Sequence, residues 1–226
     1  MKRSEINQFI EEASQIFAQH GWHLPPFAQF TPEEWTQKGH EYDEVRRSML
    51  GWDITDFGSG DYLDTGLFLF TLRNGDLKDP GNKKPYAEKL MLVKENQKTP
   101  FHFHWHKMED IINRGGGVLM VQVYEATEQE GLSEGPVKVT LDGCLTEVPA
   151  GTVLELAPGQ SITMHQRLYH QFWGKPGLGP VVVGEVSQVN DDTSDNRFLV
   201  ERGRFPAIEE DAPALRLLCN EYPQPL

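Results

Sequence analysis

The stretch that decides the fold is Thr99-Pro-Phe-His-Phe-His-Trp-His-Lys-Met-Glu-Asp-Ile-Ile-Asn-Arg-Gly-Gly-Gly117. It places His102, His104 and His106 at alternate positions and follows them with Glu109. Because side chains two apart in a β-strand point to the same face, His102 and His104 are predicted to project into one space. A bend after them can bring Glu109 to the same point, and two imidazoles with a carboxylate suit a divalent metal ion. The alternative is a surface strand with solvated histidines.

The aromatic residues Phe101, Phe103 and Trp105 alternate with these histidines, which predicts a packed apolar face behind the site. A metal ion held by two histidines and one glutamate has room for a further ligand. The segment 160–173 offers two candidates, His165 and His170. The residues alone favour His170 only slightly.

Composition limits the classes of function. The 226-residue chain carries a net charge of -13, which argues against nucleic acid and anionic membranes as partners. Its two cysteines, Cys144 and Cys219, form no disulfide framework and suit a reducing compartment. We find no signal peptide and no apolar run long enough to span a bilayer. We therefore expect a cytoplasmic protein that acts on a small molecule.

The first fifth of the chain, residues 1–50, has helical periodicity. Residues 4–20 are predicted to form a helix with Ser4 as its N-cap and Gly21 after its end. Thr31-Pro-Glu-Glu34 is a second start, because it combines an N-cap, a proline at the first helical position and a capping box. The apolar stripe expected on this second helix comprises Trp35, Tyr42, Val45 and Met49.

From residue 51 to residue 190, short apolar runs alternate with turn residues. The clearest predicted strands are 67–72, 89–93, 118–124, 137–141, 144–148, 152–156 and 181–189. Asn74-Gly75 is a hairpin signal, and Asp79-Pro-Gly-Asn82 predicts another turn. This pattern is typical of an antiparallel double-sheet jelly roll. We expect one domain over 1–226, with the tail 191–226 wrapping the barrel.

The spacing of the histidines resembles the first motif of the cupin superfamily: His102-x-His104, four residues, Glu109, six residues, Gly116. The resemblance implies a small mainly-β, cupin-type jelly-roll barrel with N-terminal helices. Asn96 stands where that motif usually opens with glycine. Since this is a turn position, the departure concerns the loop more than the ligands.

The segment His165-Gln-Arg-Leu-Tyr-His170 lies where the second cupin motif is expected. In this resemblance His170 takes the ligand position and His165 stands in place of a proline. Arg167 replaces the usual glycine of the motif, again at a turn. The resemblance thus implies that His102, His104, Glu109 and His170 share one metal ion.

Longer blocks resemble the bacterial D-lyxose isomerase family. They are residues 51–58, 107–117, 168–174, 185–192 and 195–198, and the similarity extends from the first helix to 217–222. The family implies interconversion of D-lyxose and D-xylulose, and also of D-mannose and D-fructose. It implies manganese as the ion, although the ligand types also suit cobalt, iron or zinc. It also implies a homodimer.

Aldose–ketose interconversion requires a base at carbon and an electrophile on oxygen. We expect a cis-enediol route, with a metal-promoted hydride shift as the alternative. Lys107 is a candidate electrophile, and Glu201 is the preferred general base. The alternatives without a catalytic role are a solvated lysine for Lys107 and a surface ion pair for Glu201. His106, Asp195 and His165 are candidates for binding the sugar.

Two other functions fit the same residues. A cupin oxygenase would use the metal ion with oxygen and would need no separate base. A non-catalytic sugar-binding cupin would tolerate loss of Lys107 and Glu201.

Overall fold

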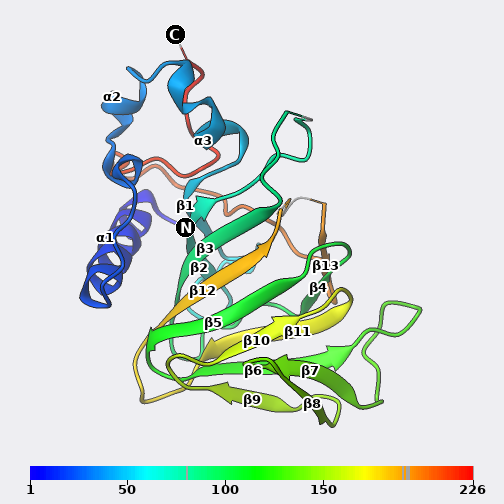
Figure 1. Cartoon of the computed structure of the whole chain (residues 1–226). Helices are drawn as coiled ribbons and strands as arrows, with labels where there is room; N and C mark the ends of the chain where they lie inside the picture. Colours follow the sequence, from blue (N-terminus) through cyan, green and yellow to red (C-terminus); the bar gives the residue numbers. More distant parts are fainter. Residues whose placement is uncertain (80, 190, 192–193, 226) are drawn as a thin grey trace.

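The computed structural model describes the chain except residues 80, 190, 192–193 and 226 (Figure 1). Its helical segments are α1 (Arg3–Gln19), η1 (Pro26–Gln29), α2 (Pro32–Trp35), η2 (His40–Tyr42) and α3 (Asp43–Arg47). Its strands are β1 (Gly51–Thr55), β2 (Leu67–Arg73), β3 (Tyr86–Val93), β4 (His102–His104), β5 (Glu109–Gly116), β6 (Leu119–Glu125), β7 (Val137–Leu141), β8 (Cys144–Val148), β9 (Val153–Leu156), β10 (Ser161–Met164), β11 (Leu168–Gly174), β12 (Val181–Gln188) and β13 (Asn196–Phe198).

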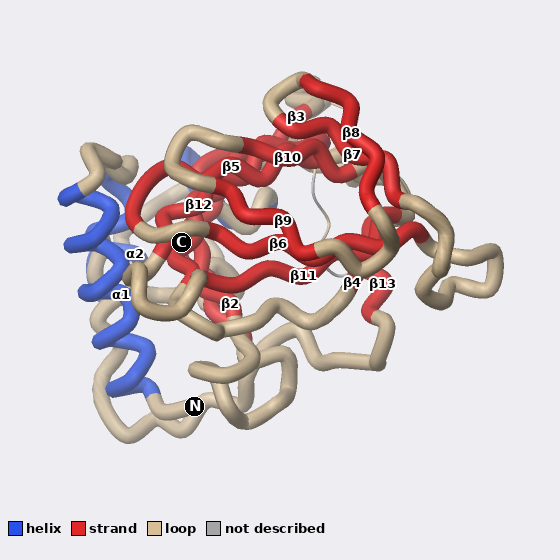
Figure 2. The backbone as a smooth tube through the Cα atoms, turned by 90° about the horizontal axis from the view of Figure 1, so that it is seen from below, coloured by secondary structure: helices blue, strands red, loops and turns tan. Residues whose placement is uncertain are grey.

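The strands form two antiparallel sheets. The large sheet has the order β1-β2-β3-β12-β5-β10-β7-β8, and the small sheet has the order β13-β4-β11-β6-β9. Figure 2 shows the two sheets facing each other, with the helices outside the strands. The predicted mainly-β jelly roll with N-terminal helices is therefore confirmed. No helix in the described part of the chain is long and apolar enough to cross a membrane.

The chain changes sheets between His104 and Glu109. His104 ends β4 in the small sheet, and Glu109 begins β5 in the large one. The bend predicted after the histidines is this crossing from one layer to the other.

One apolar core lies between the sheets and a second lies under the helices. Strands β2 and β3 supply both, because alternate side chains point to opposite faces. Leu69 and Met91 belong to the core between the sheets. Phe68 and Leu90 pack on the other face with residues of α1. Both faces of these strands are covered, which explains their nearly continuous apolar sequences.

The second predicted helix is interrupted. Thr31 caps α2 as expected, with its hydroxyl accepting from the Glu34 N–H at 3.2 Å. The helix ends at Trp35, however, and helical structure resumes only after Gly39, in η2 and α3. Trp35 and Tyr42 still meet edge to face, with ring centroids 5.6 Å apart. Met49 does not join them, because it follows the end of α3 and is 38% exposed.

The first helix begins slightly earlier than predicted. Its N-cap is Lys2 rather than Ser4, and Gly21 follows its end with a φ of 76°. Ser4 instead donates its hydroxyl to Asp211 of the tail at 2.7 Å. A tertiary contact thus takes the place of the local cap.

Asn74-Gly75 does not form a two-residue hairpin turn. Strand β2 ends at Arg73 and β3 begins only at Tyr86. A type I′ turn needs positive φ at both central residues, and neither Asn74 nor Gly75 has it. The second predicted turn is present, since the Asn82 N–H donates to the Asp79 carbonyl at 3.0 Å. Pro80, within that turn, lies outside the described residues.

The C-terminal tail returns over the barrel to the helices, as Figure 1 shows. The Cys219 N–H donates to the Trp52 carbonyl on β1 at 2.7 Å. Arg3 of α1 is 3% exposed and lies 2.7 Å from Glu210 and 2.5 Å from Glu221. The hydrogen bond to Glu210 raises the pKa of Arg3, which burial alone would lower. This guanidinium joins the two ends of the chain.

We expect Arg3→Met to lower the free energy of unfolding by about 2 kcal/mol, because two carboxylates lose their partner and one of them is partly buried. The loss stays this small because Glu210 is 59% exposed, so that solvent screens its ion pair with Arg3. Urea denaturation measures the change. The exposed Arg47→Met is the control and should change stability by less than about 0.5 kcal/mol. Equal stability of the two variants would contradict the anchoring role of Arg3.

Candidate active site

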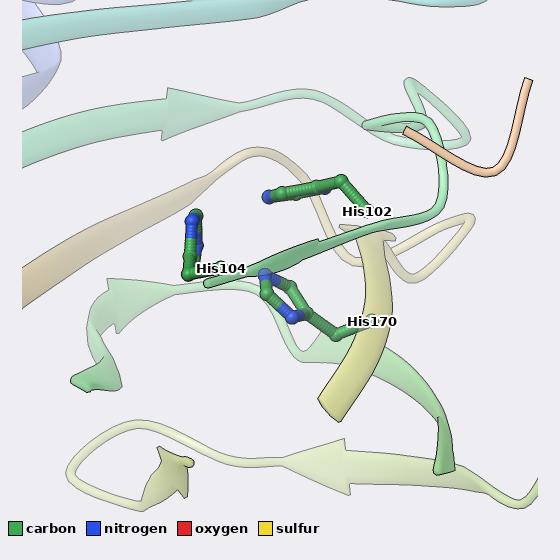
Figure 3. A group of neighbouring side chains, drawn as sticks. All are labelled: His102, His104 and His170. Carbon is green, nitrogen blue, oxygen red and sulfur yellow. The ribbon is translucent and has the colours of Figure 1, made fainter. Parts of the chain in front are cut away.

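Three histidines from the small sheet meet at one point. His102 and His104 come from β4, and His170 comes from β11 directly across from His102 in the antiparallel register. One ligating atom from each lies within 4.8 Å of the others. Figure 3 shows the three rings turned toward one another. The alternation of β4 thus produces the shared space predicted from the sequence.

Backbone carbonyls orient two of the rings. His102 Nδ1 is 2.8 Å from the Pro100 carbonyl, and His170 Nδ1 is 3.0 Å from the Leu168 carbonyl. These bonds leave Nε2 of each ring as the atom available for a metal ion. His170 Nε2 and His104 Nδ1 are buried and have no hydrogen-bond partner among the described residues. Buried nitrogens of this kind are what a metal ion would satisfy.

Glu109 joins the histidines from the other sheet. Its Oε1 lies 3.2 Å from His104 Nε2 and 3.3 Å from His170 Nε2. Its Oε2 lies 2.6 Å from Lys107 Nζ. Burial alone would raise the pKa of Glu109, but the Lys107 ammonium and the His104 ring hold it well below its usual range. The carboxylate is therefore ionised and offers its oxygens as possible ligands for a metal ion.

Two of the histidines are held neutral. Burial lowers the pKa of His102 well below its ordinary value, and nearby His170 and His104 lower it further. Burial and the Lys107 charge also lower the pKa of His104, against the opposing effect of Glu109. Neutral imidazole is the form that binds metal ions. The donors thus fit a divalent transition metal ion, for which nitrogen and oxygen ligands are typical.

A chain of buried charges continues from Glu109. Lys107 Nζ is 3.1 Å from Glu185 Oε1, and Lys89 Nζ is 3.3 Å from the same oxygen. Glu185 is 5% exposed, and both lysines are buried as well. Lys107 is therefore no solvated surface lysine.

Sequence reasoning missed Glu185 and Lys89. Both lie on long apolar strands, where β12 pairs Glu185 directly with Lys89 of β3. The signal was present, because Val181, Val183 and Glu185 alternate and so share one face. A single carboxylate on an otherwise apolar face is a polar group that needs a buried partner.

These groups line a cavity of about 50 Å³ between the sheets. His102, His104, Lys107, Glu109, Glu185 and Lys89 form its polar wall. Its apolar wall includes Leu69, Met91, Phe172 and Phe198, and Arg204 reaches it from the tail. We call it the metal cavity.

Asp195 binds the backbone of the loop that follows β4. Its carboxylate accepts the N–H of His106 at 2.8 Å and that of Lys107 at 3.1 Å, and its carbonyl accepts the N–H of Trp105 at 3.1 Å. These bonds hold the loop that carries Lys107. The structure thus places Asp195 behind the loop, outside the lining of the metal cavity.

Three further candidates lie away from the metal cavity. His106 follows the end of β4 and is exposed, whereas His102 is half-buried and His104 is buried. His165 faces Glu125, with Nε2 3.3 Å from Oε1. Glu201 is exposed on the tail and is absent from the described lining of the cavity. None of the three is brought to the histidine cluster.

The two departures from the cupin motifs have a common form. Asn96 has a φ of 58° and Arg167 a φ of 62°. Both backbones adopt the left-handed conformation that glycine ordinarily supplies. The turns are therefore kept although the glycines are absent.

Comparison with known proteins decides the family. A model of the D-lyxose isomerase family matches residues 1–222. The chain belongs to the D-lyxose isomerase family. It is 53% identical to D-lyxose/D-mannose isomerase of Serratia proteamaculans over 226 residues, covering 98% of each chain. It is 50% identical to the protein of that name from Escherichia coli O157:H7 over 225 residues, covering 99% of each. The predicted enzyme class, a sugar isomerase, is confirmed.

Solved structures confirm the cupin-type fold. L-ribose isomerase of Cellulomonas parahominis with L-ribose superposes with a TM-score of 0.61 at 19% identity. L-ribose isomerase of Acinetobacter sp. DL28 with L-ribose gives a TM-score of 0.62 at 17% identity. Each alignment covers 92% of this chain and 98% of the other. At these identities the superpositions show that this chain shares the fold of those enzymes, and they say nothing about its substrate.

The metal-free protein should lose stability in mild acid. The pKa values of His102 and His104 are lowered, so the unfolded chain takes up protons near the ordinary value of 6.5 while the folded chain does not. The free energy of unfolding is therefore retained above pH 6.5 and falls below it, by up to about 1.4 kcal/mol per group per pH unit. Urea denaturation between pH 7 and pH 5 measures this slope.

His102→Gln should flatten the slope, whereas the exposed His23→Gln should leave it unchanged. A metal-free wild-type protein with constant stability from pH 7 to pH 5 would show that the histidines are not held neutral.

Proposed function

We propose that this chain is a metal-dependent aldose–ketose isomerase that interconverts D-lyxose with D-xylulose and D-mannose with D-fructose. The observation that supports it most is the meeting, in one buried cavity, of a histidine cluster with alternating carboxylates and ammonium groups. The substrates are those named for the relatives at 53% and 50% identity.

The proposed ligands of the ion are His102, His104, His170 and Glu109. Bound there, a divalent cation would act as a Lewis acid on the neighbouring oxygens of an open-chain sugar. Manganese is the proposed ion, while cobalt, iron and zinc suit the same donors. The ring orientations of His102 and His170 favour this assignment, since both Nδ1 atoms are already bonded to carbonyls.

For the general base we propose Glu185 in place of Glu201. Glu185 lines the metal cavity and is held between Lys107 and Lys89, whereas Glu201 is exposed outside it. The Glu185 carboxylate removes the proton from C2 of the sugar and returns it to C1. Because Glu185 is 5% exposed, its carboxylate is shielded from water while it holds that proton.

Lys107 completes the transfer at the oxygens. Its ammonium hydrogen-bonds O1 as negative charge develops there and gives O1 a proton, and the resulting neutral amine takes the proton from O2 as the ketone forms. Atoms are conserved, since one proton moves from C2 to C1 and one from O2 to O1. Asp195 contributes by holding the backbone of Lys107 in place. A hydride shift from C2 to C1 is the competing route and needs no base.

Two properties remain predictions from the sequence. They are a homodimeric assembly, expected from the cupin resemblance, and a cytoplasmic location, expected from the cysteine content. An oxygenase or a non-catalytic sugar-binding protein would share the histidine cluster, and the reaction itself separates these functions.

Incubation of manganese-loaded protein with D-lyxose should produce D-xylulose without consumption of oxygen. Chromatography of the sugars and an oxygen electrode measure both quantities in one reaction. D-Mannose should yield D-fructose under the same conditions. Oxygen uptake without ketose would indicate the oxygenase, and sugar binding without ketose in any divalent metal would indicate the non-catalytic protein.

Replacement of the proposed base gives a sharper test. Glu185→Gln should lower kcat for D-lyxose by about 10²-fold or more, because the amide cannot accept the C2 proton. Its manganese content, measured by mass spectrometry, should equal that of the wild type. Glu147→Gln on the exposed face of β8 is the control and should keep kcat within about twofold. A Glu185→Gln protein with wild-type kcat would reject this base and favour the hydride shift.

A further inference from the structure

A second and larger cavity adjoins the metal cavity. Its volume is about 280 Å³, and its lining includes Ser48, Asp53, Thr71, Asn74 and Phe205. Among the described residues, only Arg204 lines both cavities. We call the larger one the outer cavity.

Both cavities lie on the same face of the large sheet. Asp53 and Thr55 are two apart on β1, so they share a face; Asp53 lines the outer cavity and Thr55 the metal cavity. Thr71 of the outer cavity pairs across the strands with Lys89 of the metal cavity. The inner surface of the sheet therefore runs without interruption from one cavity to the other.

The side chain of Arg204 stands at the boundary. Its Nη2 contacts Asp53 Oδ2, and its Nη1 lies 3.4 Å from Asp53 Oδ1. The side chains are 19% exposed for Arg204 and 5% exposed for Asp53. The guanidinium carbon also lies 4.8 Å from the centre of the Phe205 ring. The Arg204 side chain, paired with Asp53, thus lies where the two cavities meet.

Arg204 is carried by an exposed segment, residues 199–204, that we call the strap. The strap is bonded at its two ends: the Leu199 N–H donates to the Phe101 carbonyl at 2.9 Å, and the Gly203 N–H donates to the Phe57 carbonyl at 3.2 Å. Between them Val200, at 61% exposure, has little contact with the barrel. The middle of the strap is therefore packed less closely than its two ends.

The sizes of the cavities call for a movement of the strap. At roughly 10–15 Å³ for each water molecule, the metal cavity holds about four waters, fewer than the ten non-hydrogen atoms of a pentose. The outer cavity can hold a whole sugar by the same measure. Its lining carries the polar side chains of Asp53, Thr71 and Asn74, and the buried Ser48 hydroxyl has no hydrogen-bond partner among the described residues. A hydroxyl-rich ligand suits that surface.

We propose that the outer cavity is the entrance for the sugar and that Arg204 controls passage and then binds the sugar. Arg204 leaves Asp53 to admit the substrate, then returns and donates hydrogen bonds to the hydroxyls beyond C2. The reacting carbons C1 and C2 lie in the metal cavity, and the extra carbon of a hexose extends past Arg204 into the outer cavity. The inference rests on the proposed function for the choice of ligand, and it adds a residue that determines sugar binding.

Binding of unreactive alditols tests the proposal without turnover. The manganese-loaded protein is titrated with D-arabinitol, the reduced form of D-lyxose, and with D-mannitol in a calorimeter. Arg204→Gln should weaken both affinities tenfold or more, and Arg204→Lys should weaken them less, since the ammonium keeps the charge but not the fork of donors. Arg202→Gln, an exposed arginine on the same strap, should stay within twofold of wild type.

The proposed control of passage by the Arg204–Asp53 pair is tested through the rate of ligand binding. Asp53→Asn keeps the size of the side chain but weakens its hold on Arg204, so the association rate constant for D-arabinitol in stopped-flow fluorescence should rise about fivefold. A merely structural role of the pair would leave that rate constant unchanged. Arg204→Lys serves as the informative variant if Arg204→Gln fails to fold.

Wild-type affinity in both Arg204 variants, or an equal loss in Arg202→Gln, would overturn the proposal. Ketose formation by the wild type is measured separately. A failure of the isomerase assay therefore rejects the proposed function, whereas a failure of the alditol comparison rejects only the role of Arg204.

Discussion

The site depends on one buried carboxylate, that of Glu109. It contacts His104 and His170 through one oxygen and Lys107 through the other, all away from water. An isolated charge in such a place would cost several kcal/mol, so each partner must be present when the sheets close. Since the histidines come from one sheet and Glu109 from the other, the proposed ligand set comes together only in the folded barrel.

Much of this arrangement is predictable, because it follows from period-two alternation along single strands. His102 and His104 share a face for that reason, and the strands that carry the site are bounded by ordinary turn residues. Asn96 and Arg167 at first look like weaknesses in the family motifs. Their positive φ shows that the turns form without glycine.

What the sequence does not reveal depends on contacts between distant segments. Glu185 and Lys89 meet through strand pairing across almost a hundred residues, and Arg204 meets Asp53 across more than that. The apolar stripe expected on one helix is also formed across a break in the chain, because Trp35 of α2 and Tyr42 of η2 pack edge to face. His106 fits the alternation pattern but falls beyond the end of β4, where the pattern no longer holds. For this reason local rules predict the meeting of His102 and His104 better than that of Glu185 and Lys89.

The central claim is that one divalent ion binds where the two sheets meet. Anomalous diffraction from a manganese-soaked crystal tests it most directly. The account predicts one anomalous peak per chain, within bonding distance of His102, His104, His170 and Glu109. A peak on other residues, or none in a protein that isomerises D-lyxose, would contradict it.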